Sequence, residues 1–176
     1  MIRTRLTLAA AASAAAVASV LAGPAIATAA PAAPHACRGS AIHVGHGRSN
    51  GATGHVSVVL FFRNTGSVTC TLRGYPGVDA IARDGHVLKH ARRTLHGFTG
   101  GAKRVRTIAI APGRRASAQL EAHDFNFKTS GDCRSSESIS VTPPNTARAT
   151  RLFVRISVCD LQIHPVVAGS SGVSRH

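Results

Sequence analysis

The sequence has no tryptophan, one tyrosine and one methionine, and only seven acidic residues against 21 lysines and arginines. Because so few aromatic side chains could stack on bases, specific nucleic-acid binding is not expected. The scattered carboxylates offer no pair for acid–base catalysis. No glycine-rich loop leads into a predicted helix, which excludes a phosphate-binding loop of the nucleotide-binding type. Composition therefore argues against several large classes of enzyme.

Two short patterns could carry chemistry, and neither has the context that its chemistry needs. Residues 47–51 match G-x-S-x-G, but Ser49 lies in a glycine-rich stretch between predicted strands, without the strand–turn–helix that exposes a nucleophilic serine. The pairs His43/His46 and His86/His90 lack the third and fourth ligands that zinc requires. We therefore predict no catalytic residue, no metal site and no cofactor.

The first 30 residues have the three-part layout of a secretory signal. Arg3 and Arg5 precede an apolar, alanine-rich run over 6–21, and residues 27–29 (Ala-Thr-Ala) supply a small-residue cleavage site. The run is at the short end of what crosses a bilayer, and no cysteine follows it for lipid attachment. We predict cleavage and secretion, with a flexible leader over 31–36 and no transmembrane segment in the mature chain.

All four cysteines lie in the predicted mature part: Cys37, Cys70, Cys133 and Cys159. In an exported protein an even number of cysteines indicates disulfides, and no C-x-x-C pair is present to hold zinc. Four cysteines allow three pairings. We favour Cys37–Cys70, which would pin the N-terminal strand to the sheet, and Cys133–Cys159, which would tie a loop to the last strand.

Short runs of β-branched and aromatic residues alternate with turn-forming residues from Cys37 onward, and nothing resembles an amphipathic helix. The run over 55–63 predicts a central buried strand. Asp84-Gly85 predicts a tight hairpin, because this pair tolerates positive φ. Strands are predicted over 41–44, 55–63, 68–73, 78–83, 86–89, 104–110, 116–122, 138–142 and 151–159, with a segment over 161–164 extending the last or forming an edge strand. The strands over 55–63 and 68–73 should form a hairpin, residues 45–54 should form a loop, and residues 90–103 should form a flexible loop.

This pattern predicts an all-β fold, a Greek-key β-sandwich of about eight strands. The sandwich should occupy residues 37–165 and be followed by a disordered Gly/Ser-rich tail over 166–176.

Several segments together resemble a known family. The most specific stretch is 69–78 (Thr-Cys-Thr-Leu-Arg-Gly-Tyr-Pro-Gly-Val), preceded by 62–66 (Phe-Arg-Asn-Thr-Gly) and followed by 111–113 (Ala-Pro-Gly), Cys133 and 141–144 (Val-Thr-Pro-Pro). In this order they resemble the secreted and lipid-anchored actinobacterial proteins grouped as domain of unknown function 4232. The resemblance implies an extracellular immunoglobulin-like sandwich, and it brings no catalytic residue, cofactor or ligand.

The charge is concentrated in one segment. The whole chain carries +14, which falls to +12 without the two arginines of the signal. Residues 83–115 contain nine lysines and arginines and a single acid, Asp84, so this segment alone carries +8. The predicted patch for an anionic ligand consists of Arg92, Arg93, Lys103, Arg104, Arg106, Arg114 and Arg115. Such a surface attracts wall polymers or acidic lipid headgroups, although a merely solvated surface would have the same composition.

Two functions remain open. We favour an exported binding or structural module of the cell envelope that uses the basic segment for anionic partners. The alternative is a secreted hydrolase whose site has no recognisable pattern. Neither the oligomeric state nor the identity of the ligand follows from the sequence.

Overall fold

The computed structural model describes residues 33–126 and 128–174, so the predicted signal peptide lies outside the described residues. The described residues form fourteen β-strands and one short 3-10 helix (η1, Gly39–Ala41), with no α-helix among them. The predicted all-β class is confirmed. Four of the strands have only two residues, and they account for most of the excess over the predicted eight.

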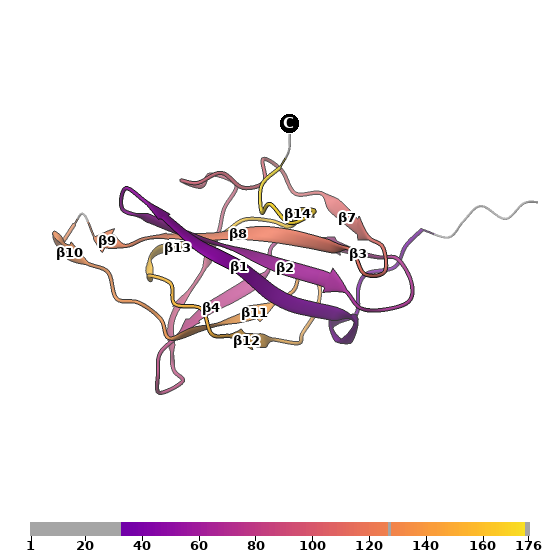
Figure 1. The fold of residues 1–176 in the computed structure, drawn as a ribbon, viewed down its shortest axis with the longest axis horizontal. Coiled ribbons are helices and arrows are strands. Elements are labelled where there is room, and N and C mark those ends of the chain that lie inside the picture. Colours follow the sequence, from indigo (N-terminus) through magenta and orange to yellow (C-terminus); the bar gives the residue numbers. More distant parts are fainter. Residues whose placement is uncertain (1–32, 127, 175–176) are drawn as a thin grey trace, which may run out of the picture. The chain divides into compact units, whose positions relative to one another are not determined.

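The larger sheet has six strands and is shown with the rest of the fold in Figure 1. Its order is β1 (Ile42–Ala52), β2 (His55–Asn64), β8 (Arg115–His123), β13 (Cys159–Ile163) and β6 (Arg92–Arg93), with β14 (Val167–Ala168) beside β8. The pairs β1–β2, β2–β8 and β8–β13 are antiparallel, whereas β6 runs parallel to β13.

A second sheet has four strands, in the order β12 (Thr150–Leu152), β11 (Ser138–Thr142), β4 (Gly77–Ile81) and β5 (Val87–His90). Two short pairs complete the fold: β3 (Cys70–Arg73) with β7 (Thr107–Ile110), and β9 (Phe125–Asn126) with β10 (Gly131–Asp132). The chain passes repeatedly between the two larger sheets, so strands that are adjacent in sequence often lie in different layers, as in Greek-key folds.

One hydrophobic core joins the two larger sheets. Strand β2 contributes Val58, Leu60 and Phe62, which are fully buried and alternate along the strand, and Leu120 of β8 lies beside them. Ile139 of β11 belongs to the same cluster. Since side chains of a strand alternate between faces, each sheet turns one apolar face inward.

The β1–β2 hairpin is longer than the sequence predicts. Most of the predicted loop over 45–54 continues β1 and pairs with β2, with a register shift between His46 and Ser49. Thr53 and Gly54 have φ values of 51° and 80°, as a two-residue type I′ turn requires. The glycines of this stretch have low β-propensity and therefore suggest a loop. Hydrogen bonds to β2 nevertheless hold the stretch as a strand.

Two other strand predictions are wrong. The strand over 68–73 does not form a hairpin with β2, because β3 pairs with β7 instead. The strand over 151–159 is divided, since β12 ends at Leu152 and the next strand begins at Cys159. The Asp84-Gly85 hairpin is confirmed between β4 and β5, and Gly85 has a φ of 92°.

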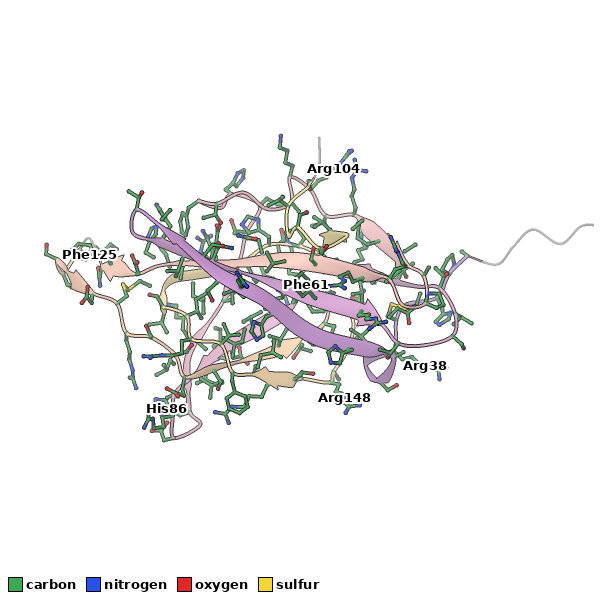
Figure 2. All side chains as sticks on the ribbon, viewed as in Figure 1. Arg38, Phe61, His86, Arg104, Phe125 and Arg148 are labelled. Atoms are coloured by element: carbon green, nitrogen blue, oxygen red, sulfur yellow. A yellow bond between two sulfur atoms is a disulfide. The ribbon has the colours of Figure 1, made fainter. Side chains whose placement is uncertain are left out.

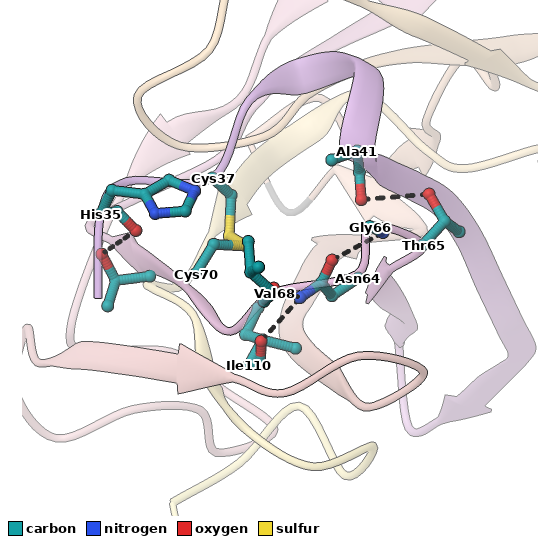
Figure 3. The surroundings of a disulfide bond; sticks show 10 residues. His35, Cys37, Ala41, Asn64, Thr65, Gly66, Val68, Cys70 and Ile110 are labelled. Carbon is teal, nitrogen blue, oxygen red and sulfur yellow. Dashed lines mark hydrogen bonds between the residues drawn. A yellow bond between two sulfur atoms is a disulfide. The ribbon is translucent and has the colours of Figure 1, made fainter. Parts of the chain in front are cut away.

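The structure confirms both favoured disulfides, Cys37–Cys70 and Cys133–Cys159. The first is flanked by hydrogen bonds from the backbone of Thr71 to His35 and from Cys37 back to Thr71. Ala36 also forms a parallel bridge with Thr71, so the end of the predicted flexible leader is tied to the sheet. Figure 3 shows this corner of the molecule.

Asn64 stabilises the same corner from the end of β2. It is fully buried, and its side-chain amide donates to the carbonyl oxygens of Val68 and Ile110, both at 2.8 Å, while its own oxygen accepts from the Gly66 backbone (Figure 3). Every hydrogen-bonding group of this side chain is therefore satisfied. Part of the family-like stretch over 62–66 thus has a structural role, joining β2, β7 and the approach to β3.

Candidate functional site

The outer face of the six-stranded sheet carries a row of polar residues that is covered. On β8, Ser117, Gln119 and Glu121 alternate with core residues, yet none of the three is exposed. Their cover is residues 94–106, here called the strap, together with the C-terminal segment over 166–174. The strap begins where the Thr94 backbone donates to the Ile163 carbonyl.

The strap is fixed by one buried carboxylate. Both Glu121 and His164 are 0% exposed, and Nε2 of His164 lies 2.9 Å from a carboxylate oxygen of Glu121. The same oxygen accepts from the Phe98 backbone at 3.1 Å and from the Gln162 amide at 3.0 Å. The other oxygen accepts from the backbone and hydroxyl of Thr99, at 2.9 and 2.5 Å. Five donors thus converge on one carboxylate. Two are side chains, Gln162 on β13 and His164 just after it, and the other three are groups of the strap.

Two glycines allow the strap to approach this pair. A Cβ at Gly97 would overlap the Glu121 carboxylate, and one at Gly101 would overlap the His164 ring. Gly101 also has a φ of 115°, which side chains rarely adopt. Residues 90–103, predicted to be a flexible loop, are therefore strand β6 followed by an anchored segment, because a non-local carboxylate supplies the hydrogen bonds that the segment cannot make internally.

The hydrogen bonds to Glu121 outweigh the effect of its burial. Burial alone would raise the pKa of this carboxyl, but the hydrogen bonds from His164 and Thr99 lower its pKa below the ordinary value. The group is accordingly held as a carboxylate, which is the form that accepts from all five donors.

The C-terminal segment is ordered by pairing with β8 and by hydrogen bonds to β8 and the strap. Val167 and Ala168 pair with β8 as strand β14, and Val166 is 1% exposed. The Gly172 backbone donates to the Ser117 hydroxyl, and the Ser174 backbone donates to the Gly101 carbonyl. The predicted disordered tail is therefore wrong for residues 166–174: backbone pairing with β8 and the strap replaces the local propensity that the Gly/Ser sequence lacks.

A basic groove lies where the strap meets this C-terminal segment. Its volume is about 480 Å³, and it is lined by Lys103, Arg104, Arg106, Ile108, Val166, Val167, Ala168, Val173 and Ser174. Arg104 and Arg106 are exposed, Ile108 and Val173 are half-buried, and none of the lining residues is acidic. Figure 2 shows Arg104 on the opposite side of the view from the β4–β5 hairpin that carries His86. Cationic and aliphatic side chains thus share one concave surface.

The structure divides the predicted basic patch into three parts. Arg92 and Arg93 lie on β6, at the edge of the larger sheet, where Arg92 donates to the Gln162 side chain at 2.5 Å. Lys103, Arg104 and Arg106 line the groove. Arg114 and Arg115 lie at the start of β8, and the guanidinium of Arg115 sits 5.3 Å from the centre of the Phe61 ring.

The first and third parts lie near opposite ends of β8. Gln162 of β13 pairs with Glu121 on one side and with Arg92 on the other, so Arg92 lies level with Glu121. Arg115 is six residues before Glu121 on β8. At about 3.3 Å per residue this is roughly 20 Å along the strand. All seven side chains are exposed, and the three of the strap line the groove.

A second hollow of about 510 Å³ lies between the β1–β2 hairpin and the strap, and its lining is largely neutral. Residues lining it include Asn50, Thr53, Ser57, Thr99 and Gln119. At its end Phe98 stacks on His123, with 4.1 Å between ring centres, and His55 lies 5.0 Å from Phe98.

The other candidate residues stay apart. Ser49 is exposed on β1 opposite Val58, not on a strand-to-helix turn. His86 and His90 each contact a separate aspartate, Asp84 at 2.5 Å and Asp79 at 2.7 Å. Within residues 33–126 and 128–174, no three side chains of metal-binding type are grouped. In the same ranges, no helix has the length and apolarity needed to cross a membrane.

The fold and the site together define a disulfide-bonded all-β domain with a basic groove at the edge of its larger sheet. The chain belongs to the family described as "Domain of unknown function (DUF4232)", whose sequence profile matches residues 37–171. The resemblance noted from the sequence is therefore confirmed.

Other comparisons add little. A search of curated proteins found no match. Among solved structures, a Se-Met labelled β-glucosidase from Kluyveromyces marxianus is similar over 70% of this chain, at 8% identity and a TM-score of 0.29. The chain spans 15% of the length of that protein, and a likeness of this size carries no argument.

Sequence reasoning missed Glu121 and His164. The sequence predicts a strand over 116–122, and in the structure Glu121 lies on the face of β8 that points away from the core. What no local pattern indicates is that the outer face is itself covered. The nearest signal is the pair Gly97 and Gly101, flanking Phe98 and Thr99 in a segment without periodicity.

Proposed function

We propose that this domain is exported and acts as a non-enzymatic binding module that docks through its basic strap and neighbouring arginines onto an anionic component of the cell envelope. The partner class comprises anionic wall polymers and acidic lipid headgroups. Export is supported by the signal-like residues 1–30 together with two disulfides, which persist in oxidising compartments.

One observation carries the proposal. Residues 83–115 have a net charge of +8, and the seven cationic side chains of the predicted patch are all exposed. A cluster of one sign raises the local concentration of counter-charged partners and speeds their association. The non-enzymatic part is supported by the positions of the candidate residues, since Ser49 lies in a paired strand and His86 and His90 each contact a separate aspartate.

The test is retention of the purified mature domain on cell-envelope fractions at about 0.05 M and about 0.5 M salt, where the screening length falls several-fold. Retention should decrease with salt. It should also fall when four cations of the segment are neutralised together: Arg92→Gln, Arg93→Gln, Lys103→Gln and Arg104→Gln.

The matched control removes four exposed cations outside the segment: Arg48→Gln, Arg134→Gln, Arg148→Gln and Arg155→Gln. Both variants have the same net charge, so only the position of the charge differs. Equal retention of the two variants would contradict the proposal, as would retention that does not depend on salt.

A further inference from the structure

The groove at the end of the strap combines two chemistries that a purely polyanionic partner would not use together. Arg104 and Arg106 line it with guanidinium groups, which bind phosphate oxygens through paired hydrogen bonds. Beside them lie aliphatic side chains contributed by other segments, Ile108 from β7 and Val173 from the C-terminal segment. A solvated basic surface needs no such hollow.

The hollow has the dimensions of a small-molecule site. Its volume of about 480 Å³ falls within the range of about 300–1,000 Å³ found for ligand pockets. Val166 and Val167 close its floor and are 1% and 7% exposed, so they are held by the core and by the pairing of β14. Ala168 is exposed at the rim. The apolar part of the surface is therefore preformed.

Charge also selects the ligand. None of the described residues that line the groove carries a carboxylate, and the strap residues from 94 to 106 contain no acid. An anionic group bound at Arg104 and Arg106 would therefore meet no like charge from the described lining. A long polyanion would leave the aliphatic wall in contact with water, whereas a ligand with one anionic head and one hydrocarbon chain would cover both parts.

We propose that this groove binds an anionic lipid of the envelope, with its phosphate on Arg104 and Arg106 and the first methylenes of its chain along Ile108 and Val173. This deepens the proposed function and rests on it, because it names the ligand of the basic strap. It differs from general electrostatic docking in one measurable respect: affinity depends on the hydrocarbon chain as well as on charge.

The probes are methyl, butyl, hexyl and octyl phosphate, each below its critical micelle concentration, titrated calorimetrically into the mature domain. Each methylene that enters the groove should raise the affinity about four-fold until the groove is filled. Methyl phosphate should bind weakly. Octyl maltoside, which has the chain without the charge, should bind much more weakly than octyl phosphate because it makes no ion pair with the two arginines.

Two variants separate the parts of the site. Arg104→Gln with Arg106→Gln should lower the affinity for octyl phosphate about ten-fold or more, whereas Arg48→Gln with Arg148→Gln, which removes the same charge elsewhere, should leave it nearly unchanged. Val173→Thr keeps the shape of the side chain and replaces one methyl group by a hydroxyl. It should reduce the gain per methylene while leaving methyl phosphate binding unchanged.

The inference is overturned if affinity does not rise with chain length, or if the two arginine pairs lower it equally. It is also overturned, with the proposed function intact, if the domain is retained on envelope fractions in a salt-dependent way and Arg104→Gln with Arg106→Gln has no effect on octyl phosphate. Failure of both the retention assay and the titration would remove the proposed function as well.

Discussion

Replacing Glu121 by glutamine should loosen the strap and cost the domain a measurable part of its stability. The change keeps the size of the side chain but turns one carboxylate oxygen, an acceptor, into an amide NH2 group, a donor. Each oxygen of Glu121 faces at least two donors: His164, Gln162 and the Phe98 backbone on one side, and two groups of Thr99 on the other. Whichever oxygen is replaced, donors that were satisfied will face another donor.

The magnitude follows from the number of orphaned groups. A buried donor without a partner costs about 1–3 kcal/mol, and Glu121→Gln orphans at least one fully and weakens others, so we expect a loss of about 3 kcal/mol. For a domain of this size the midpoint of thermal unfolding should fall by about 10 °C. Glu121→Ala, which orphans all five donors and adds a cavity, should cost more, about 4–5 kcal/mol.

The assay is urea unfolding followed by far-UV circular dichroism, because the chain has no tryptophan to report by fluorescence. The matched control is Glu137→Gln. That carboxylate is 43% exposed in its side chain and lies 3.9 Å from Arg83, so its replacement should change stability by less than about 0.5 kcal/mol. In Glu121→Gln, a peptide spanning Gly97 and Gly101 should exchange its amide hydrogens faster than in wild type under conditions where the domain is still folded.

The direction of the Glu121 pKa shift determines how its contribution to stability changes with pH. Because the pKa of Glu121 is lowered in the folded protein, its stabilisation is fully present above the unfolded pKa of about 4.3 and is lost as pH falls through the lower folded value. The difference between wild type and Glu121→Gln should therefore be constant from pH 7 to about pH 5 and shrink below about pH 4. A difference under about 1 kcal/mol at pH 7 would refute the reasoning, and so would one that persists unchanged at pH 3.

Three further predictions concern single contacts. Asn64→Ala should cost about 3 kcal/mol in urea unfolding, since the Val68 and Ile110 carbonyls lose their donor, and Asn64→Asp should not rescue it because it cannot donate to both. Gly101→Ala should shift strap exchange as Glu121→Gln does, without any pH dependence of its own. The oxidised mature chain should be about 4 Da lighter than its reduced form, and four alkylatable thiols would contradict the disulfides.

The parts of the fold that local sequence predicts are those stabilised locally. Strand β2 was predictable because its own residues, with Val58, Leu60 and Phe62 alternating inward, favour a buried strand. The β4–β5 hairpin was predictable because Asp84-Gly85 determines its turn. The disulfides followed from the exported character of the chain and the placement of the cysteines.

The parts that local sequence does not predict depend on distant partners. The second half of β1 contains Gly47 and Gly51 and is ordered by β2. The strap is ordered by Glu121, which lies 22 residues from Thr99, and the C-terminal segment by Ser117 of β8, which lies 55 residues from Gly172. In each case the missing information is a tertiary hydrogen bond. The basic patch was predicted as one surface, and only the fold separates Arg92 from Arg115.

The strap connects the buried carboxylate to the groove. For the affinity of the groove for an anion, this connection predicts a change opposite in direction to the one expected from charge alone when Glu121 is neutralised. Gly101 contacts the His164 ring, Ala102 is 1% exposed, and the cationic wall of the groove begins at the next residue. Removing the negative charge of Glu121 should strengthen the binding of any anion if only charge matters. If the anchor positions Arg104 and Arg106, loosening it should weaken binding instead.

Glu121→Gln should therefore bind octyl phosphate several-fold more weakly than wild type at pH 7 and at temperatures where both are fully folded. Glu137→Gln, which removes the same charge away from the strap, should bind it as well as wild type or slightly better. Equal or tighter binding by Glu121→Gln would show that the buried carboxylate stabilises the strap without positioning the groove.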